Sequence, residues 1–391
     1  MRATLGLAAG LAAAALVFAA AAGAQPPPRM LPGLTPAAAD GLSRALSAGR
    51  LSEAEYALER ARSLFRLGHV RREFGDVERP GGRDATLILR DLAARLDDLD
   101  GAERRLAEAI LARPTDGKVP EGTHAYKAGT VSRYTCGADM CFHWVETTAD
   151  APDLNDTTPA DGIPDWVGNV QATWEHVWAK EIDEYHYRPP LDDSASAQTD
   201  GPSGADLGKL DVYVVNLGQD PIVAFGYCAA LEDGFTTPVY CVVDDDYAEF
   251  LGQEPEAFLQ VTSAHEFHHA SQAAYDFWED AWFIEGTATN IEETVYPDVD
   301  DNVNFLRIWS PLTRPGSPLD RGGFGDSEYG AWIFWRYLEE KVGGTEILRQ
   351  IWLRARGDSY SLKATRRELA ARGESVPDTF VRFAVTNRRR G

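Results

Sequence analysis

The segment His265-Glu266-Phe267-His268-His269 has the composition and spacing of a metal-binding helix. Residues four apart on an α-helix point about 40° apart and rise about 6 Å, so His265 and His269 can reach one ion. Glu266, next to the first of these histidines, can then act on a water bound to that ion. A helix whose histidines only pack or face solvent is the simpler alternative, but the flanking sequence supplies further parts of a metal site.

A third ligand is expected in the apolar segment 282–288. Hydrolytic zinc needs three protein ligands and an open fourth position. Glu285 lies in this segment, where an unpaired carboxylate would be costly, and a turn after His269 would bring the next helix back antiparallel. We therefore predict Glu285 as the third ligand. A glutamate favoured by the dipole at a helix start is the alternative reading, and Glu292 and Glu293 are the reserve ligands.

Residues 153–165 form a second cluster of possible ligands, because Asp and Asn alternate there around a glycine turn. Calcium takes six to eight oxygens, which this pattern can supply. The segment is not an EF-hand, since no glutamate follows at the twelfth position. An ordinary Asx-turn loop that caps the next helix explains it almost as well. The calcium ligands that we predict are Asp153, Asn155, Asp161 and Asp165. The run Asp244-Asp245-Asp246 is interpreted as a solvated strand end.

The N-terminus has the pattern of an export signal over residues 1–24. Arg2 precedes an apolar, alanine-rich stretch, and Ala22-Gly23-Ala24 is a small-residue cleavage site. A lone N-terminal membrane anchor is the alternative. We expect a secreted or periplasmic protein that leaves the membrane after signal cleavage. The net charge of −23 disfavours nucleic acid and anionic membranes as partners and suits divalent cations.

The four cysteines suit an oxidising compartment. Their spacing favours two local bridges, Cys136–Cys141 and Cys228–Cys241, over the other two pairings. Binding of all four to one metal ion is the alternative, but the gaps within each pair are too wide for a zinc ribbon.

The chain divides into a Pro-rich leader at 25–37, a helical region at 38–115 and a mixed region at 120–391. Ser52 and Glu55 make a capping box in the helical region, which is either a propeptide or a permanent accessory domain. A cysteine-based latency switch is excluded there, because the first cysteine is Cys136. Strand-like runs at 141–147, 210–216 and 239–244 come before most of the helices, which indicates an α+β fold. The helices expected in the mixed region are 166–185, 255–277, 281–295, 327–341, 345–355, 361–372 and 377–386.

Three motifs together resemble the gluzincin class of zinc metallopeptidases: the HEFHH segment, residues 282–288 and residues 328–335. Within that class the chain is similar to a group of secreted bacterial proteins classed as peptidases, over roughly residues 140–345. The resemblance implies a zincin-like catalytic domain with a mixed sheet, an active-site helix and a helical C-terminal part.

The same resemblance implies zinc on His265, His269 and Glu285, with Glu266 as general base. Tyr329 would donate to the oxyanion, although a tyrosine in an aromatic helix more often packs in the core. Many gluzincins carry an aspartate four residues after the glutamate ligand, where this chain has a threonine at position 289. Support for the histidines must then come from Glu292 or a backbone carbonyl.

These features predict a secreted zinc endopeptidase that acts on a protein or peptide substrate. A catalytically inert binding module with a structural zinc and a calcium-braced loop is the first alternative. A zinc hydrolase acting on a non-protein amide, such as a cell-wall peptide, is the second.

Overall fold

The structure is a computed structural model that describes residues 40–116, 125–194, 208–218, 224–320, 327–356 and 360–390. The expected signal peptide and Pro-rich leader lie outside these residues. Within them, no helix is long and apolar enough to cross a membrane.

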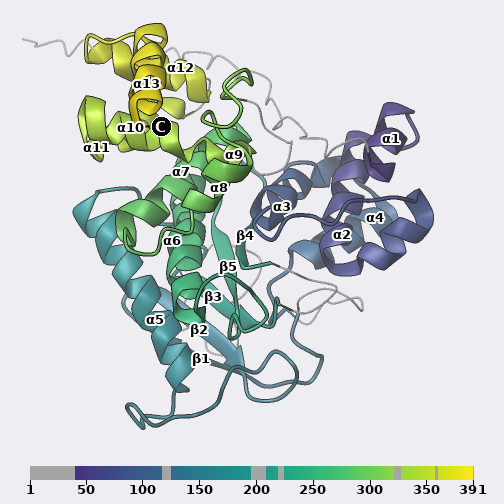
Figure 1. Ribbon diagram of the computed structural model, residues 1–391. Coiled ribbons are helices and arrows are strands. Elements are labelled where there is room, and N and C mark those ends of the chain that lie inside the picture. Colours follow the sequence, from purple (N-terminus) through teal and green to yellow (C-terminus); the bar gives the residue numbers. More distant parts are fainter. Residues whose placement is uncertain are drawn as a thin grey trace, which may run out of the picture. The chain divides into compact units, whose positions relative to one another are not determined.

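A mixed sheet of five strands forms the centre of the described chain (Figure 1). In spatial order its strands are β1 (Ser132–Cys136), β2 (Met140–Val145), β3 (Leu210–Val215), β5 (Val239–Asp244) and β4 (Gly226–Ala230). β2, β3 and β5 are parallel to one another, and β1 and β4 pair antiparallel at the two edges. Every residue of β2, β3, β4 and β5 is buried, which agrees with their largely apolar sequences. The fold is therefore mixed, with helices around a partly parallel sheet.

Both predicted disulfides are present, and each joins residues that face each other on neighbouring antiparallel strands. Cys136–Cys141 closes the β1–β2 hairpin, and Cys228–Cys241 links β4 to β5. The alternative of one metal ion on four cysteines is thereby wrong.

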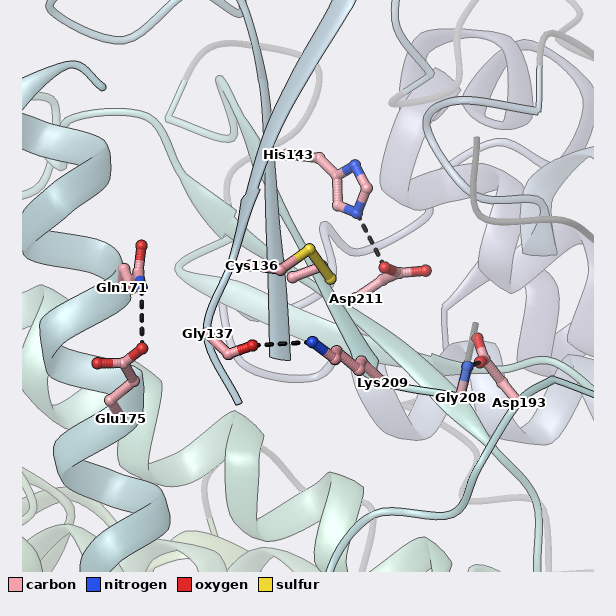
Figure 2. The surroundings of a disulfide bond; sticks show 10 residues. Cys136, Gly137, His143, Gln171, Glu175, Asp193, Gly208, Lys209 and Asp211 are labelled. Carbon is pink, nitrogen blue, oxygen red and sulfur yellow. Dashed lines mark hydrogen bonds and ion pairs between the residues drawn. A yellow bond between two sulfur atoms is a disulfide. The ribbon is translucent and has the colours of Figure 1, made fainter. Parts of the chain in front are cut away.

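The surroundings of the Cys136–Cys141 bridge tie this hairpin to β3 (Figure 2). Lys209 Nζ donates to the carbonyl of Gly137 at 2.9 Å, and His143 Nε2 lies 2.8 Å from Asp211 Oδ1. The buried His143 therefore has a carboxylate partner within the sheet.

Helices account for most of the remaining described chain. The N-terminal ones are α1 (Gly41–Ser47), α2 (Glu53–Phe74), α3 (Ala85–Ala93), the 3-10 turn η1 (Leu96–Asp98) and α4 (Gly101–Leu111). The predicted capping box starts α2: Ser52 Oγ accepts from Glu55 N at 3.2 Å, and Glu55 Oε2 accepts from Ser52 N at 2.6 Å.

The helices of the mixed region lie largely where the sequence predicted them. They are α5 (Asp165–Trp178), the π-helical turn η2 (Ala179–Glu184), α6 (Pro255–Ala273), α7 (Ala281–Val295), α8 (Val303–Ile308), α9 (Ser327–Gly330), α10 (Trp332–Leu338), the π-helical turn η3 (Glu339–Gly343), α11 (Glu346–Ala355), α12 (Ser361–Ala371) and α13 (Val376–Arg390). The strands β1 and β4 and the short helix α8 were not predicted. The single helix expected over 327–341 is broken after Gly330.

Candidate metal centre

Helices α6 and α7 position the predicted ligands. α6 packs on β4, β5, α5 and α7, which buries nearly all of it from Phe258 onward. Its late residue Gln272 contacts Ile284 near the start of α7, while the earlier His265 contacts Glu292 further along α7. The two helices therefore run antiparallel, as the expected turn requires.

The two histidines and Glu285 converge at one point. Glu285 Oε2 lies 3.1 Å from His265 Nε2 and 3.6 Å from His269 Nε2. Ligand atoms about 2.0–2.1 Å from a tetrahedral zinc lie about 3.3–3.4 Å apart, so these separations fit a shared ion. Each of the three residues is at most 1% exposed. The donor types and the two separations to Glu285 Oε2 therefore suit zinc, and the group whose ligand atoms all lie within 4.8 Å of one another joins the two histidines with Glu266.

Gln272 orients His269 and fixes its tautomer. Gln272 Nε2 donates to the Ile284 carbonyl at 2.9 Å, which turns Gln272 Oε1 toward His269 Nδ1 at 2.8 Å. Nδ1 must then carry the proton, which leaves the lone pair of Nε2 facing Glu285. This role of Gln272 was not foreseen, although its position three residues after His269 on the same helix is a usable signal.

Glu292 performs the equivalent task for His265. Its Oε1 lies 2.7 Å from His265 Nδ1 and 2.6 Å from an Arg83 nitrogen. Glu292 was one of the two expected sources of support in place of the missing aspartate. Thr289 occupies that position and is fully buried, and its hydroxyl has no hydrogen-bond partner among the described residues.

The centre is built for positive charge. Burial opposes the charged form of His265, but hydrogen bonds and charge from Glu285 and Glu292 raise its pKa to about 10. Burial likewise opposes ionisation of Glu285, but His269 and His265 lower its pKa to about 2. Within the described chain, His269 Nε2 and Glu285 Oε1 are buried without a hydrogen-bond partner. A divalent cation between the two imidazoles and Glu285 would satisfy His269 Nε2.

Glu266 lies beside this centre. Atoms of its carboxylate and of the His265 and His269 imidazoles lie within 4.8 Å of one another. Glu266 is 1% exposed, and its Oε2 accepts a hydrogen bond from Thr86 Oγ1 of α3 at 2.9 Å. Burial is the largest cause that raises the pKa of its carboxyl.

Tyr329 is next to the centre, but its hydroxyl is engaged elsewhere. Its ring lies 6.1 Å from that of His265, centroid to centroid, and the side chain is 1% exposed. The hydroxyl donates to Asp84 Oδ1, on the residue before α3, at 3.3 Å. The structure thus brings the predicted oxyanion donor to the site with its proton directed at a carboxylate.

The predicted calcium ligands are not gathered in the same way. Among the described residues, two groups of His, Cys, Asp or Glu ligand atoms lie within 4.8 Å of one another: one joins His265, Glu266 and His269, and the other joins Asp244, Asp246 and Glu249. Neither group includes Asp153, Asp161 or Asp165, and Glu285 is outside both as well. Asp165 instead accepts hydrogen bonds from the backbone of residues 157 and 158, and Asn155 Nδ2 donates to Asp153 at 2.8 Å. Calcium in this loop stays a prediction.

Two of the three acids in the run at the end of β5 are buried, whereas the whole run was expected to be solvated, and Asp246 is exposed as expected. Asp244 is fully buried and Asp245 is 4% exposed. Asp244 accepts from the backbone N–H groups of Leu217 and Gly218 at 2.6 and 2.8 Å. Its carboxylate therefore holds the segment that follows β3 against the end of β5, which is a structural role that an Asp-rich run does not indicate.

Comparison with protein-family models gave no match for this chain, and comparison with curated proteins gave no significant match.

Proposed function

We propose that this protein is a secreted zinc-dependent endopeptidase with a zincin-like, gluzincin-type catalytic domain. The observation that carries the proposal is the convergence of His265 Nε2 and His269 Nε2 on Glu285, with Glu266 alongside. These three residues would hold zinc. When bound, zinc would supply polarisation of the scissile carbonyl and a lowered pKa for a bound water.

The residues of the chain divide the remaining work. Glu266 takes the proton of the attacking water and passes it to the leaving amine. Glu292 and Gln272 hold the two imidazoles with Nδ1 protonated, so that both Nε2 atoms face Glu285. Tyr329 donates to the developing oxyanion once its hydroxyl is released from Asp84.

The decisive test compares Glu266→Gln with Glu256→Gln, an exposed glutamate near the start of the same helix. Both full-length variants are loaded with zinc, and their metal content and hydrolysis of a denatured protein substrate are measured. We expect Glu266→Gln to keep its zinc and lose about 10²–10⁴-fold in hydrolysis. Glu256→Gln should match the wild type. Undiminished hydrolysis by zinc-loaded Glu266→Gln would remove Glu266 from its assigned role.

Complete burial of the centre favours one second candidate, an inert module whose zinc is structural. His265, His269, Glu285 and Glu266 are each at most 1% exposed. A structural zinc has four protein ligands and no exchangeable position. Stoichiometric zinc without hydrolysis of any protein, peptide or cell-wall amide, in any variant that exposes the site, would favour this candidate.

A further inference from the structure

One short segment of the N-terminal helical region contacts both groups to which the proposed mechanism assigns proton chemistry. We call residues 81–86 the cover segment. Thr86 Oγ1 donates to Glu266 Oε2 at 2.9 Å, and Asp84 Oδ1 accepts from the hydroxyl of Tyr329 at 3.3 Å. The general base and the oxyanion donor are thus both engaged by residues lying two positions apart.

The cover segment also occupies backbone donors at the edge of the sheet. β4 is an edge strand, and α3 packs against it (Figure 1). Phe225 N, just before β4, donates to the Gly82 carbonyl at 3.0 Å, and Cys228 N within β4 donates to Thr86 Oγ1 at 2.9 Å. Extended peptides bind proteins by pairing with such edge donors. The segment therefore takes the hydrogen bonds that a bound peptide would use there.

Arg83 anchors the segment to the metal centre. Its guanidinium lies 2.6 Å from Glu292, which orients His265, and 2.6 Å from Asp301. Arg83 is only 7% exposed, so both contacts are shielded from water and from salt. A charged, buried contact of this kind is costly to break on one side only, which favours a well-defined docked state.

These contacts bury the metal centre at which the proposed function places a peptide substrate. Glu266 is 1% exposed and Thr86, which covers it, is fully buried. We propose that the cover segment is an intramolecular inhibitor that keeps the peptidase latent, and that substrate reaches the centre only when α3 leaves β4. The inference rests on the proposed function, and it assigns the helical region a regulatory role. Because no cysteine precedes Cys136, this latency works without a thiolate on the metal.

The test replaces the covering hydroxyl while keeping its volume. Thr86→Val removes the donor to Glu266, and Thr86→Ser retains it. Thr115→Val is the matched control, because Thr115 Oγ1 lies 3.2 Å from the hydroxyl of Tyr213 on β3, away from the predicted ligands. Zinc-loaded full-length proteins are compared in two measurements: the rate at which dipicolinate removes zinc, and hydrolysis of a denatured protein.

We expect Thr86→Val to accelerate zinc removal and hydrolysis by about 10-fold or more, the factor set by losing a hydrogen bond to a charged group. Thr86→Ser and Thr115→Val should stay within about 2-fold of the wild type. Should Thr86→Val fail to fold by circular dichroism, Asp84→Ala at a half-buried position replaces it, with the same direction expected. A folded Thr86→Val, or failing that Asp84→Ala, that leaves zinc removal unchanged would overturn the inference.

The two proposals can fail separately. Faster zinc removal with no hydrolysis by any variant would keep the cover and reject the peptidase. Glu266-dependent hydrolysis at the same rate in wild type and Thr86→Val, with unchanged zinc removal, would keep the peptidase and reject the cover.

Discussion

Helix α6 carries two buried histidine–carboxylate centres that differ in charge. His265 contacts Glu285 and Glu292 of α7, whereas the one carboxylate that His268 Nδ1 contacts among the described residues is that of Glu181 in η2, at 2.7 Å. Both histidines are 1% exposed. Burial and the charges of His269 and His265 hold the pKa of His268 well below its ordinary value, and burial raises the pKa of Glu181 well above its own. Burial therefore favours the neutral form of both His268 and Glu181.

The contrast shows how many partners a buried charge needs. Beside one carboxylate, the desolvation of the imidazolium dominates and lowers the pKa of His268. Two carboxylates do offset it, so the pKa of His265 rises to about 10. The side of α6 that faces α7 thus stabilises a cation, and the side that faces η2 does not. His265 and His268 lie in the same motif, but their different surroundings shift their pKa values in opposite directions.

The sharpest way to break this contrast is to remove one histidine from each centre. His269→Ala deletes a predicted zinc ligand, so zinc affinity should fall by more than about 100-fold, beyond the range seen for outer partners. His268→Ala should bind zinc within about 3-fold of the wild type while unfolding at lower urea concentration, because it leaves a cavity and Glu181 unpaired. Competition with a fluorescent zinc chelator measures both affinities. Equal losses in the two variants would show that the centres are not distinct.

A smaller effect on zinc affinity is expected from the carboxylates that contact the histidines through Nδ1. Glu292→Ala removes the carboxylate that orients His265, and zinc affinity should fall by about 10–100-fold. Glu181→Ala removes the equivalent partner of His268 and should leave zinc affinity unchanged. The same chelator competition compares them. A loss in Glu181→Ala as large as that in Glu292→Ala would mean that the fold, and not the orientation of His265, controls the metal.

What the sequence could predict follows from how local each constraint is. Helix geometry alone predicts that His265 and His269 lie on one face. The position of Glu285 beside them required only the further assumption that the next helix runs back antiparallel. The Val-rich strands β3 and β5 were found for the same reason, because their pattern lies within six residues. β4 was missed, since its sequence Gly-Tyr-Cys-Ala-Ala lacks the β-branched residues that mark a strand.

Local sequence patterns could not predict the contacts between the cover segment and the metal centre. Thr86 and Glu266 are 180 residues apart, and Arg83 and Glu292 are 209 apart. Neither Arg83, just before α3, nor Thr86, in its first turn, stands out in the sequence, because a single arginine or threonine carries no pattern that indicates a distant partner. The burial of Asp244 was not predicted for a related reason: an aspartate that accepts from backbone N–H groups cannot be told from a solvated one by its sequence.

Glu279 extends the comparison to a buried carboxyl whose neighbours are acids, six residues before Glu285. Burial and the charges of Asp276 and Asp280 raise its pKa to about 9, whereas the histidines lower that of Glu285 to about 2. A carboxyl whose pKa is raised in the folded state stabilises the fold fully below its unfolded pKa of about 4.5. That stabilisation is lost as the pH rises toward 9.

The variant Glu279→Gln is neutral at every pH and should therefore gain stability over the wild type as the pH rises. We expect a difference near zero at pH 5 that grows by up to about 1.4 kcal/mol per pH unit toward pH 8. Urea unfolding at matched ionic strength measures it, with the exposed Glu78→Gln as the control for the substitution itself. If the free energies of unfolding of Glu279→Gln and wild type differ by a constant amount from pH 5 to 8, the acids around Glu279 do not raise its pKa. The comparison with Glu285, whose pKa the histidines lower, would then fail. The direction of a buried carboxyl's pKa shift would then not follow from the charges of its neighbours. The low pKa of Glu285 would no longer support a cation between His265, His269 and Glu285.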